Sequence, residues 1–189
     1  MATSKVAIAN LALQKLGVKR IESLTQDAPN ARSVNNCFDS LRDTLLRRYD
    51  WSFAIKRASI AADGDYDEWG DWDAYTKPND YIRLLRDNES GVAVDWKIEG
   101  DFILSMDGSP LEIRYIARID DPNKYDAAFV EALACMIASQ CCEEITGSSS
   151  KQVNIDKARD AAIDEGYRTG AIEKEASEPP EDDWIAARR

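Results

Sequence analysis

The sequence contains no histidine, and this absence excludes several kinds of catalytic and metal-binding site. A serine or cysteine nucleophile activated by histidine is impossible, and so is a zinc site with mixed cysteine and histidine ligands. The four cysteines do not have the spacing of a zinc site either. We therefore expect no catalytic residue, no cofactor and no metal. We expect buried free thiols in a reducing cytosol at Cys37, Cys135, Cys141 and Cys142.

Long apolar runs and glycine-rich phosphate loops are also missing. No run approaches the roughly 20 residues that a membrane helix needs, and the first residues lack the apolar core of a secretory signal. We therefore expect no membrane partner. Basic residues are few, with 24 against 35 acidic ones and a net charge of −11. That balance argues against a protein that wraps nucleic acid, although it allows a channel through which DNA slides.

What the sequence does contain is 44% hydrophobic residues in 189, enough for a soluble domain with a core. A helix is predicted from Pro29 onward because apolar residues recur at steps of three and four. Pro29 suits the first helical turn, and Asp27 is expected to cap it. The helix leads into three aromatic residues, which we expect to be buried where helices and sheet meet. These are Tyr49, Trp51 and Phe53.

The end of this helix is basic, which favours the helix dipole. In an assembly the same arginines are candidates for contacts with acidic patches on a neighbouring copy. They are Arg42, Arg47 and Arg48.

Three further helices are predicted. The first is capped by Ser4 and runs to Leu16, with Gly17 placed for a left-handed C-cap. The third runs from Asp126 to about Thr146, and the fourth begins near Lys151. Gly166 and Gly170 weaken the fourth helix by about 1 kcal/mol each. Between the second and third helices, short alternating runs separated by turn residues predict a small antiparallel sheet over residues 55–118.

The acidic stretch from Asp63 to Asp73 holds six carboxylates and three aromatic residues without one basic residue. Read as a calcium loop starting at Asp65, it fails at the fifth and twelfth positions, which are Trp69 and Thr76. A solvated acidic loop is the simplest interpretation. A pair of acids for glycoside cleavage is the alternative that this composition allows.

After residue 174 the chain becomes acidic and proline-containing, and we expect an extended arm over residues 175–189. The predicted fold is therefore α+β: a four-helix bundle with a small antiparallel sheet inserted between helices 2 and 3, plus the arm. Residues 1–54 would supply helices 1 and 2, and residues 55–120 the inserted β subdomain. Residues 121–174 would supply helices 3 and 4.

Four segments together resemble the head–tail adaptor proteins of short-tailed bacteriophages, a family also called tail tubular protein A or tail-accessory adaptor. The longest combines Leu-Arg-Asp-x-Leu-Leu-Arg with Tyr-x-Trp-x-Phe-Ala and ends at Ala54. The others are residues 8–17, 78–85 and 129–134, reading Ile-Ala-Asn-Leu-Ala-Leu-Gln-Lys-Leu-Gly, Pro-Asn-Asp-Tyr-Ile-Arg-Leu-Leu and Phe-Val-Glu-Ala-Leu-Ala. Their order and spacing along most of the chain carry the resemblance.

The resemblance implies a virion structural protein and not an enzyme. It would bind under the portal ring as a ring of twelve copies, extend the channel for the genome DNA without reading its sequence, and connect to tail nozzle or tail-tip proteins. It would lie in the host cytoplasm during assembly and in the virion afterwards. The arm would reach along the portal, with contacts expected at its tip. The tip residues are Trp184, Ile185, Arg188 and Arg189.

Two other functions come from different classes. One is a carboxylate-based cell-wall hydrolase that uses the acids from Asp63 to Asp73. The other is a small cytosolic protein-binding adaptor unrelated to phage. Loss of a measured hydrolytic activity on changing Asp71 and Asp73 would favour the hydrolase, whereas co-purification with a portal would favour the head–tail adaptor.

Overall fold

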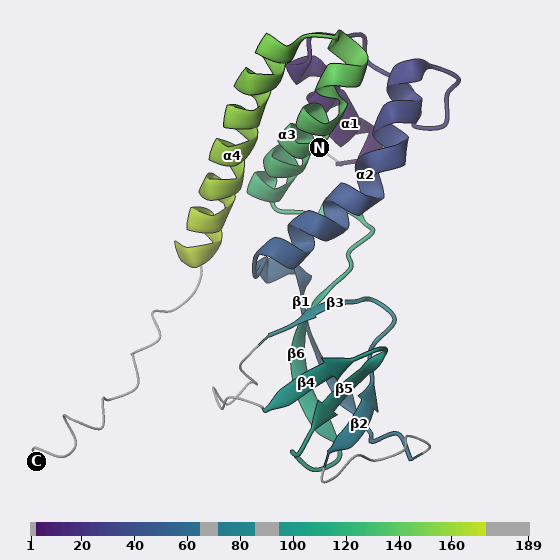
Figure 1. Ribbon diagram of the computed structural model, residues 1–189, viewed down its shortest axis with the longest axis vertical. Helices are drawn as coiled ribbons and strands as arrows, with labels where there is room; N and C mark the ends of the chain where they lie inside the picture. Colours follow the sequence, from purple (N-terminus) through teal and green to yellow (C-terminus); the bar gives the residue numbers. More distant parts are fainter. Residues whose placement is uncertain (1–2, 65–71, 86–94, 173–189) are drawn as a thin grey trace, which may run out of the picture.

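The computed structural model describes residues 3–64, 72–85 and 95–172 (Figure 1). Within these residues the fold is mixed α and β, as predicted, with four α-helices and two three-stranded antiparallel sheets. The helices lie at one end of the molecule and the strands at the other (Figure 1). In chain order the elements are α1 (Lys5–Lys15), α2 (Pro29–Arg48), β1 (Ile55–Ile60), β2 (Asp73–Thr76), β3 (Tyr81–Leu84), β4 (Trp96–Glu99), β5 (Phe102–Ser105), β6 (Leu111–Ala117), α3 (Ala127–Thr146) and α4 (Ser149–Ile172).

The first helix begins and ends where the sequence predicts. The Ser4 hydroxyl accepts a hydrogen bond from the backbone N–H of Ala7 at 3.0 Å, and Gly17 adopts a φ of +66° just past the helix end. That left-handed conformation costs glycine little, so the chain can leave the helix there. The connector to α2 is then held by Asn10, whose amide bonds both the N–H and the C=O of Ile21.

The start of α2 differs from the prediction in one detail. Pro29 occupies the first turn as expected, but the N-cap residue is Ala28, and no side chain caps the helix. Asp27 instead pairs with Arg32 at 3.2 Å. The predicted cap at Asp27 is therefore wrong, because Asp27 lies one residue too early in the chain. The apolar stripe itself is confirmed, with Ala31, Val34, Phe38 and Leu45 buried.

Helix α3 is the central helix, in contact with α1, α2 and α4. Every residue from Ala132 to Ser139 is buried, and the alanines among them let the neighbouring helices approach closely. Asp126 caps its start by accepting from the Ala128 N–H at 2.7 Å, and Gly147 ends it with a φ of +62°. The spacing and both ends of this helix are confirmed.

The strands form two sheets where the sequence predicted one. Their orders are β1-β6-β3 and β2-β5-β4, with all pairs antiparallel. Strand β2 was not predicted, because it is only four residues long and directly follows the acidic stretch. Its Tyr75 is nevertheless fully buried and donates a hydrogen bond to the Asp107 C=O at 2.8 Å. Within the predicted sheet, residues 65–71 and 86–94 lie outside the described residues.

Five aromatic rings pack where helices and strands meet. The Trp51 ring lies 5.0 Å from that of Phe129, and Phe53 lies 5.1 Å from Phe129 and 5.7 Å from Tyr125. Tyr49 joins the group at 6.2 Å from Trp51. Trp51 is 4% exposed, and its Nε1–H donates to the Leu45 C=O at 3.0 Å. The prediction that Trp51 is a core residue is confirmed.

Helix α4 continues through both glycines that were expected to weaken it. At Gly166 a Cβ atom would lie 2.8 Å from Cη2 of the Trp51 ring, whereas at Gly170 it would meet no atom within 4 Å. Gly166 is therefore needed for close approach between α4 and Trp51. The contact joins residues far apart in the sequence, so the local pattern cannot reveal it.

This difference between the two glycines gives a test of the packing. Gly166→Ala should lower the free energy of unfolding by about 1–3 kcal/mol, because the new methyl group is forced against a buried ring. Gly170→Ala should raise it by up to about 1 kcal/mol, because alanine favours the helix and has room. Urea unfolding of both variants measures the two effects. Equal stabilisation by both changes would show that Trp51 does not pack on Gly166.

Candidate functional site

The three arginines predicted as contact residues occupy three different environments. Arg42 is 3% exposed and lies among carboxylates from two parts of the chain. Its guanidinium contacts Asp39 at 3.0 Å, Asp43 at 2.8 Å and Asp120 at 2.7 Å. Arg42 therefore links α2 to the segment that precedes α3, and its buried position does not suit the predicted role as a contact residue.

The electrostatics of this cluster favour the charged forms of Arg42 and Asp39. Burial acts to lower the pKa of Arg42, but the hydrogen bond to Asp43 and the nearby carboxylate charges outweigh it and raise that pKa. The hydrogen bond from Lys5, helped by the charge of Arg42, lowers the pKa of Asp39. Lys5 belongs to α1, so the same cluster also joins α1 to α2.

Arg47 and Arg48 are both exposed at the end of α2. Arg47 donates to the Ile82 C=O at 2.7 Å, and Arg83 donates back to the Arg47 C=O at 3.0 Å. Arg83 also pairs with Asp50. These contacts fix the end of α2 on β3. The side chain of Arg48, in contrast, forms no hydrogen bond or ion pair with the residues that the structure describes.

Two hollows adjoin Arg48, and together they form a groove between α2 and α4. We call this surface the α2–α4 groove. The larger hollow, about 590 Å³, is lined by Leu41, Thr44, Arg47, Arg48, Met136, Ser139, Gln140, Arg159 and Asp160. The smaller, about 330 Å³, is lined by Arg48, Tyr49, Asp50, Trp51, Arg83, Gly166, Tyr167 and Gly170.

The lining of the groove is basic and aromatic although the chain as a whole is acidic. It includes four arginines and two aspartates. Tyr167 is 58% exposed, and its ring lies 5.2 Å from that of Tyr49. Tyrosine and arginine are typical of residues that contribute strongly to protein–protein binding. The groove is therefore suited to an acidic protein segment with apolar side chains.

The walls of the groove are held in place by polar contacts. Arg159 of α4 donates to the Ser139 hydroxyl of α3 at 2.9 Å and pairs with Asp156 at 3.1 Å. The same Ser139 hydroxyl donates to Asp156 at 2.5 Å, and this hydrogen bond, against the effect of burial, lowers the pKa of Asp156. The spacing between α3 and α4 is thus fixed without Arg48 or Tyr167.

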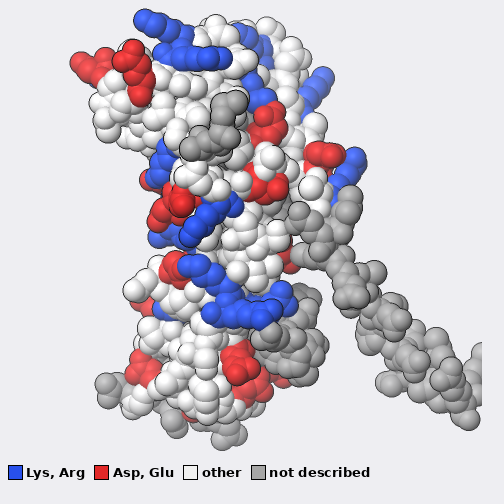
Figure 2. Space-filling model, turned by 180° about the vertical axis from the view of Figure 1, so that it is seen from behind, with Lys and Arg blue, Asp and Glu red and all other residues white. Residues whose placement is uncertain are grey.

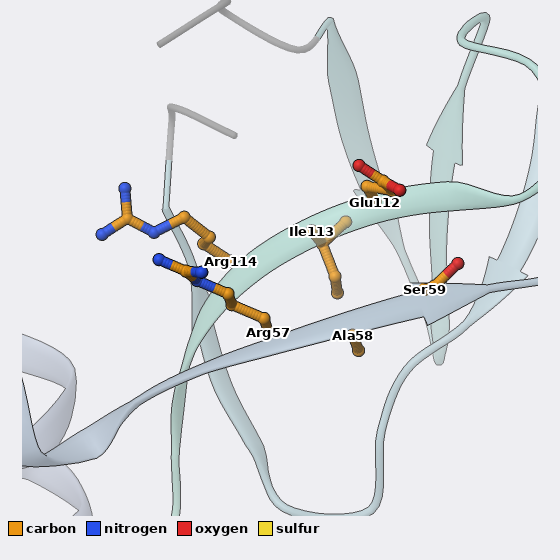
Figure 3. A pocket seen from close by; sticks show the side chains of 6 residues that line it. All are labelled: Arg57, Ala58, Ser59, Glu112, Ile113 and Arg114. Atoms are coloured by element: carbon orange, nitrogen blue, oxygen red, sulfur yellow. The ribbon is translucent and has the colours of Figure 1, made fainter. Parts of the chain in front are cut away.

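A second basic surface lies on the β1–β6 sheet, where Arg57 and Arg114 are direct cross-strand partners. Figure 3 shows the two guanidinium groups close to each other, with Ser59 and Glu112 further along the same strands. The cavity they line holds about 200 Å³. Arg114 Nε is buried without a hydrogen-bond partner, and like charges placed opposite each other destabilise a sheet. The two facing guanidinium groups therefore favour the binding of an anion in this cavity.

Basic side chains also mark the level at which the helices meet the strands. Seen from behind, lysines and arginines gather there, and acidic side chains are interspersed with them (Figure 2). The contacts place Lys56 at this level, where it pairs with Asp80 at 2.5 Å. Asp80 also accepts from the Tyr115 hydroxyl at 2.9 Å. Burial and this bond to Asp80 raise the pKa of Tyr115 to about 12.

The acidic stretch and the end of the arm lie largely or wholly outside the described residues. Of the six acids only Asp63 and Asp73 are described: Asp63 accepts from the Thr76 hydroxyl at 3.0 Å, and Asp73 lies 3.5 Å from the Tyr75 hydroxyl. In the described part of the chain, no three potential ligands are grouped as a metal ion would need. The predicted portal contacts lie beyond residue 172 and are not described: Trp184, Ile185, Arg188 and Arg189.

Sequence reasoning missed the α4 side of the groove. Arg159 and Tyr167 were not singled out, because both lie in a helix whose apolar pattern is weak. Tyr167 gives no distinctive local signal, because a single aromatic residue in a weakly patterned helix is compatible with an exposed face. Its partner Tyr49 is distant in the sequence, so only the fold brings the two rings together.

The different environments of Arg42 and Arg48 can be compared by one substitution on one helix. Arg42→Met should lower the free energy of unfolding by about 1–3 kcal/mol, because it leaves three carboxylates without their shared partner. Arg48→Met should change it by no more than about 0.5 kcal/mol. Denaturant titrations of both variants supply the measurement. A stable Arg42→Met variant would mean that the carboxylate cluster does not hold α2 in place.

The comparisons with known proteins do not assign the chain to a family. The sequence matches no model of a known protein family, and no curated protein is significantly similar to it. Among the described residues, no helix combines the length and the apolar character that crossing a membrane requires. The function is therefore inferred from the residues and contacts of this chain.

Proposed function

We propose that the chain is a head–tail adaptor of a short-tailed bacteriophage. It binds under the portal ring as one copy of a ring of twelve, extends the DNA channel and connects the portal to tail nozzle or tail-tip proteins. It acts by binding and assembly, first in the host cytoplasm and then in the virion.

The observation that carries this proposal is where the family-like segments meet. Trp51 and Phe53 come from one segment and Phe129 from another, and their rings lie within 6.1 Å of each other. A third segment supplies Ile82, whose C=O accepts from Arg47. Three of the four segments that carry the resemblance therefore meet where the helices join the strands, and the fourth, residues 8–17, includes most of α1. The meeting of these segments supports the proposal that the resemblance extends to the fold.

In this proposal the four helices form a bundle and residues 55–120 are a β subdomain inserted between α2 and α3. Residues 175–189 are an extended arm that orders on the portal. Chains that fold on binding lose conformational entropy only then, so such an arm contributes little to the stability of the free protein.

The α2–α4 groove would contact the neighbouring copy in the ring. A net charge of −11 makes identical chains repel one another, and a basic groove on each copy would offset that repulsion locally. Arg48 is the arginine best suited to this role, because it is exposed and has no internal partner among the described residues. The occupant would be an acidic surface of the next copy.

The proposal is tested with purified rings of the portal protein from the same phage. Wild-type chain should co-sediment with the rings in a density gradient. Arg48→Glu should weaken this association by about tenfold or more, since it places a carboxylate against the acidic surface of the next copy. Lys157→Glu is the matched control, because it makes the same charge change at an exposed α4 residue outside the groove lining.

Two results would contradict this proposal. Failure of the wild-type chain to associate with the portal would exclude the adaptor function and favour an unrelated protein-binding adaptor. Equal effects of Arg48→Glu and Lys157→Glu would leave the adaptor function standing but would remove the groove from the contact between copies.

The arm has its own test. Deletion of residues 176–189 should leave the melting temperature nearly unchanged and weaken portal binding severely, and Trp184→Ala should reproduce much of the loss. Aromatic and arginine residues supply most of the binding energy at many interfaces, which is the reason for this expectation. A truncated chain that binds portal as well as the full chain does would show that the helices and sheets carry the contact.

A further inference from the structure

Two cysteines from different helices lie side by side. Cys37 of α2 and Cys141 of α3 are both free thiols, and their Sγ atoms are 3.6 Å apart. Cys37 is half-buried, and Cys141 is 2% exposed. A disulfide bond has a length of about 2.05 Å, so an approach of about 1.5 Å would join the two sulfur atoms.

The other two cysteines have different neighbours. Cys135 lies 3.8 Å from the Glu131 carboxylate, and Cys142 lies 3.6 Å from the Thr146 hydroxyl. Both are buried. Of the four thiols, only Cys37 combines partial exposure with a neighbouring thiol, so a small oxidant in solution reaches it most easily.

The contact between the two thiols also makes them chemically unequal. The hydrogen bond from the Cys141 thiol lowers the pKa of Cys37, although burial and the Glu144 carboxylate oppose this. The same bond and burial raise the pKa of Cys141. The thiolate is the reactive form of cysteine, so Cys37 is the attacking group and Cys141 the second partner.

We propose that Cys37 and Cys141 are a reactive dithiol pair that a peroxide converts into a disulfide between α2 and α3. The Cys37 thiolate attacks one oxygen of hydrogen peroxide, the O–O bond breaks, and sulfenic acid and hydroxide form. The proton that the Cys37 thiol released on forming its thiolate neutralises the hydroxide and gives the first water. The Cys141 sulfur then attacks the Cys37 sulfur and displaces its hydroxyl group, which leaves with the Cys141 proton as the second water. Two thiols are oxidised and one peroxide is reduced to two waters.

This disulfide would link α2 to α3 covalently, in addition to the contacts that already hold the two helices together. Ser33 of α2 already donates to Glu144 of α3 at 2.7 Å, so the two helices are held close at this level before oxidation. The disulfide would close a loop of the chain from Cys37 to Cys141, which contains every strand from β1 to β6. Long closed loops restrict the unfolded chain most, so the oxidised protein should be the more stable form. The proposal does not depend on the phage function.

The test uses the full chain, first reduced and then treated with stoichiometric hydrogen peroxide. The intact mass should fall by two hydrogen atoms, and peptide mapping without reductant should link Cys37 to Cys141. The melting temperature should rise by about 5–10 °C and return to its starting value with dithiothreitol. If both cysteines are still alkylated by iodoacetamide after the peroxide step, or if Cys37 is found linked to another residue, the proposal is wrong.

Single variants separate the two roles. In Cys141→Ser the Cys37 sulfenic acid should persist and react with dimedone, whereas Cys37→Ser should give no such adduct at Cys141. Cys135→Ser is the matched control and should form the disulfide as the wild type does. Dimedone labelling at Cys141 in the Cys37→Ser variant, as fast as the labelling at Cys37 in Cys141→Ser, would overturn the assignment of Cys37 as the attacking thiol.

Discussion

The packing of Trp51 against Gly166 is the contact on which the rest of the structure depends. Trp51 follows α2 directly, and its ring contacts Phe129 of α3 and the open face of Gly166 in α4. One side chain therefore sets the positions of three helices at the level where the strands begin. The same contact makes the groove, because α4 comes close at Gly166 and leaves open space at Gly170.

Local patterns predicted the helices well and long-range contacts poorly. The steps of three and four, the cap at Ser4 and the glycines after α1 and α3 depend on neighbouring residues, and all of them are confirmed. Strand β2 was missed because four residues carry too little periodicity, and its stability comes from pairing with β5. The continuation of α4 through Gly166 depends on a ring that the local pattern cannot contain.

In the candidate site, too, the local sequence did not predict the roles of the charged residues. A basic helix end made Arg42, Arg47 and Arg48 equivalent in the sequence, but the fold assigns them to a buried carboxylate cluster, a contact with β3 and an exposed groove. Arg42 is distinguished by Asp120, Arg47 by Ile82 and Arg48 by α4, and all three partners lie far from these arginines in the sequence. A basic, aromatic groove on an acidic protein is electrostatically complementary to an acidic surface, which is the basis of the proposed contact between copies.

The central claim is that this chain completes the connection between portal and tail, and electron micrographs of the chain mixed with its cognate portal test it most directly. The account predicts an additional ring under the portal, with twelve copies coaxial with it and a continuous channel through both. Portal rings that show no added density at saturating concentrations of the chain would contradict the account.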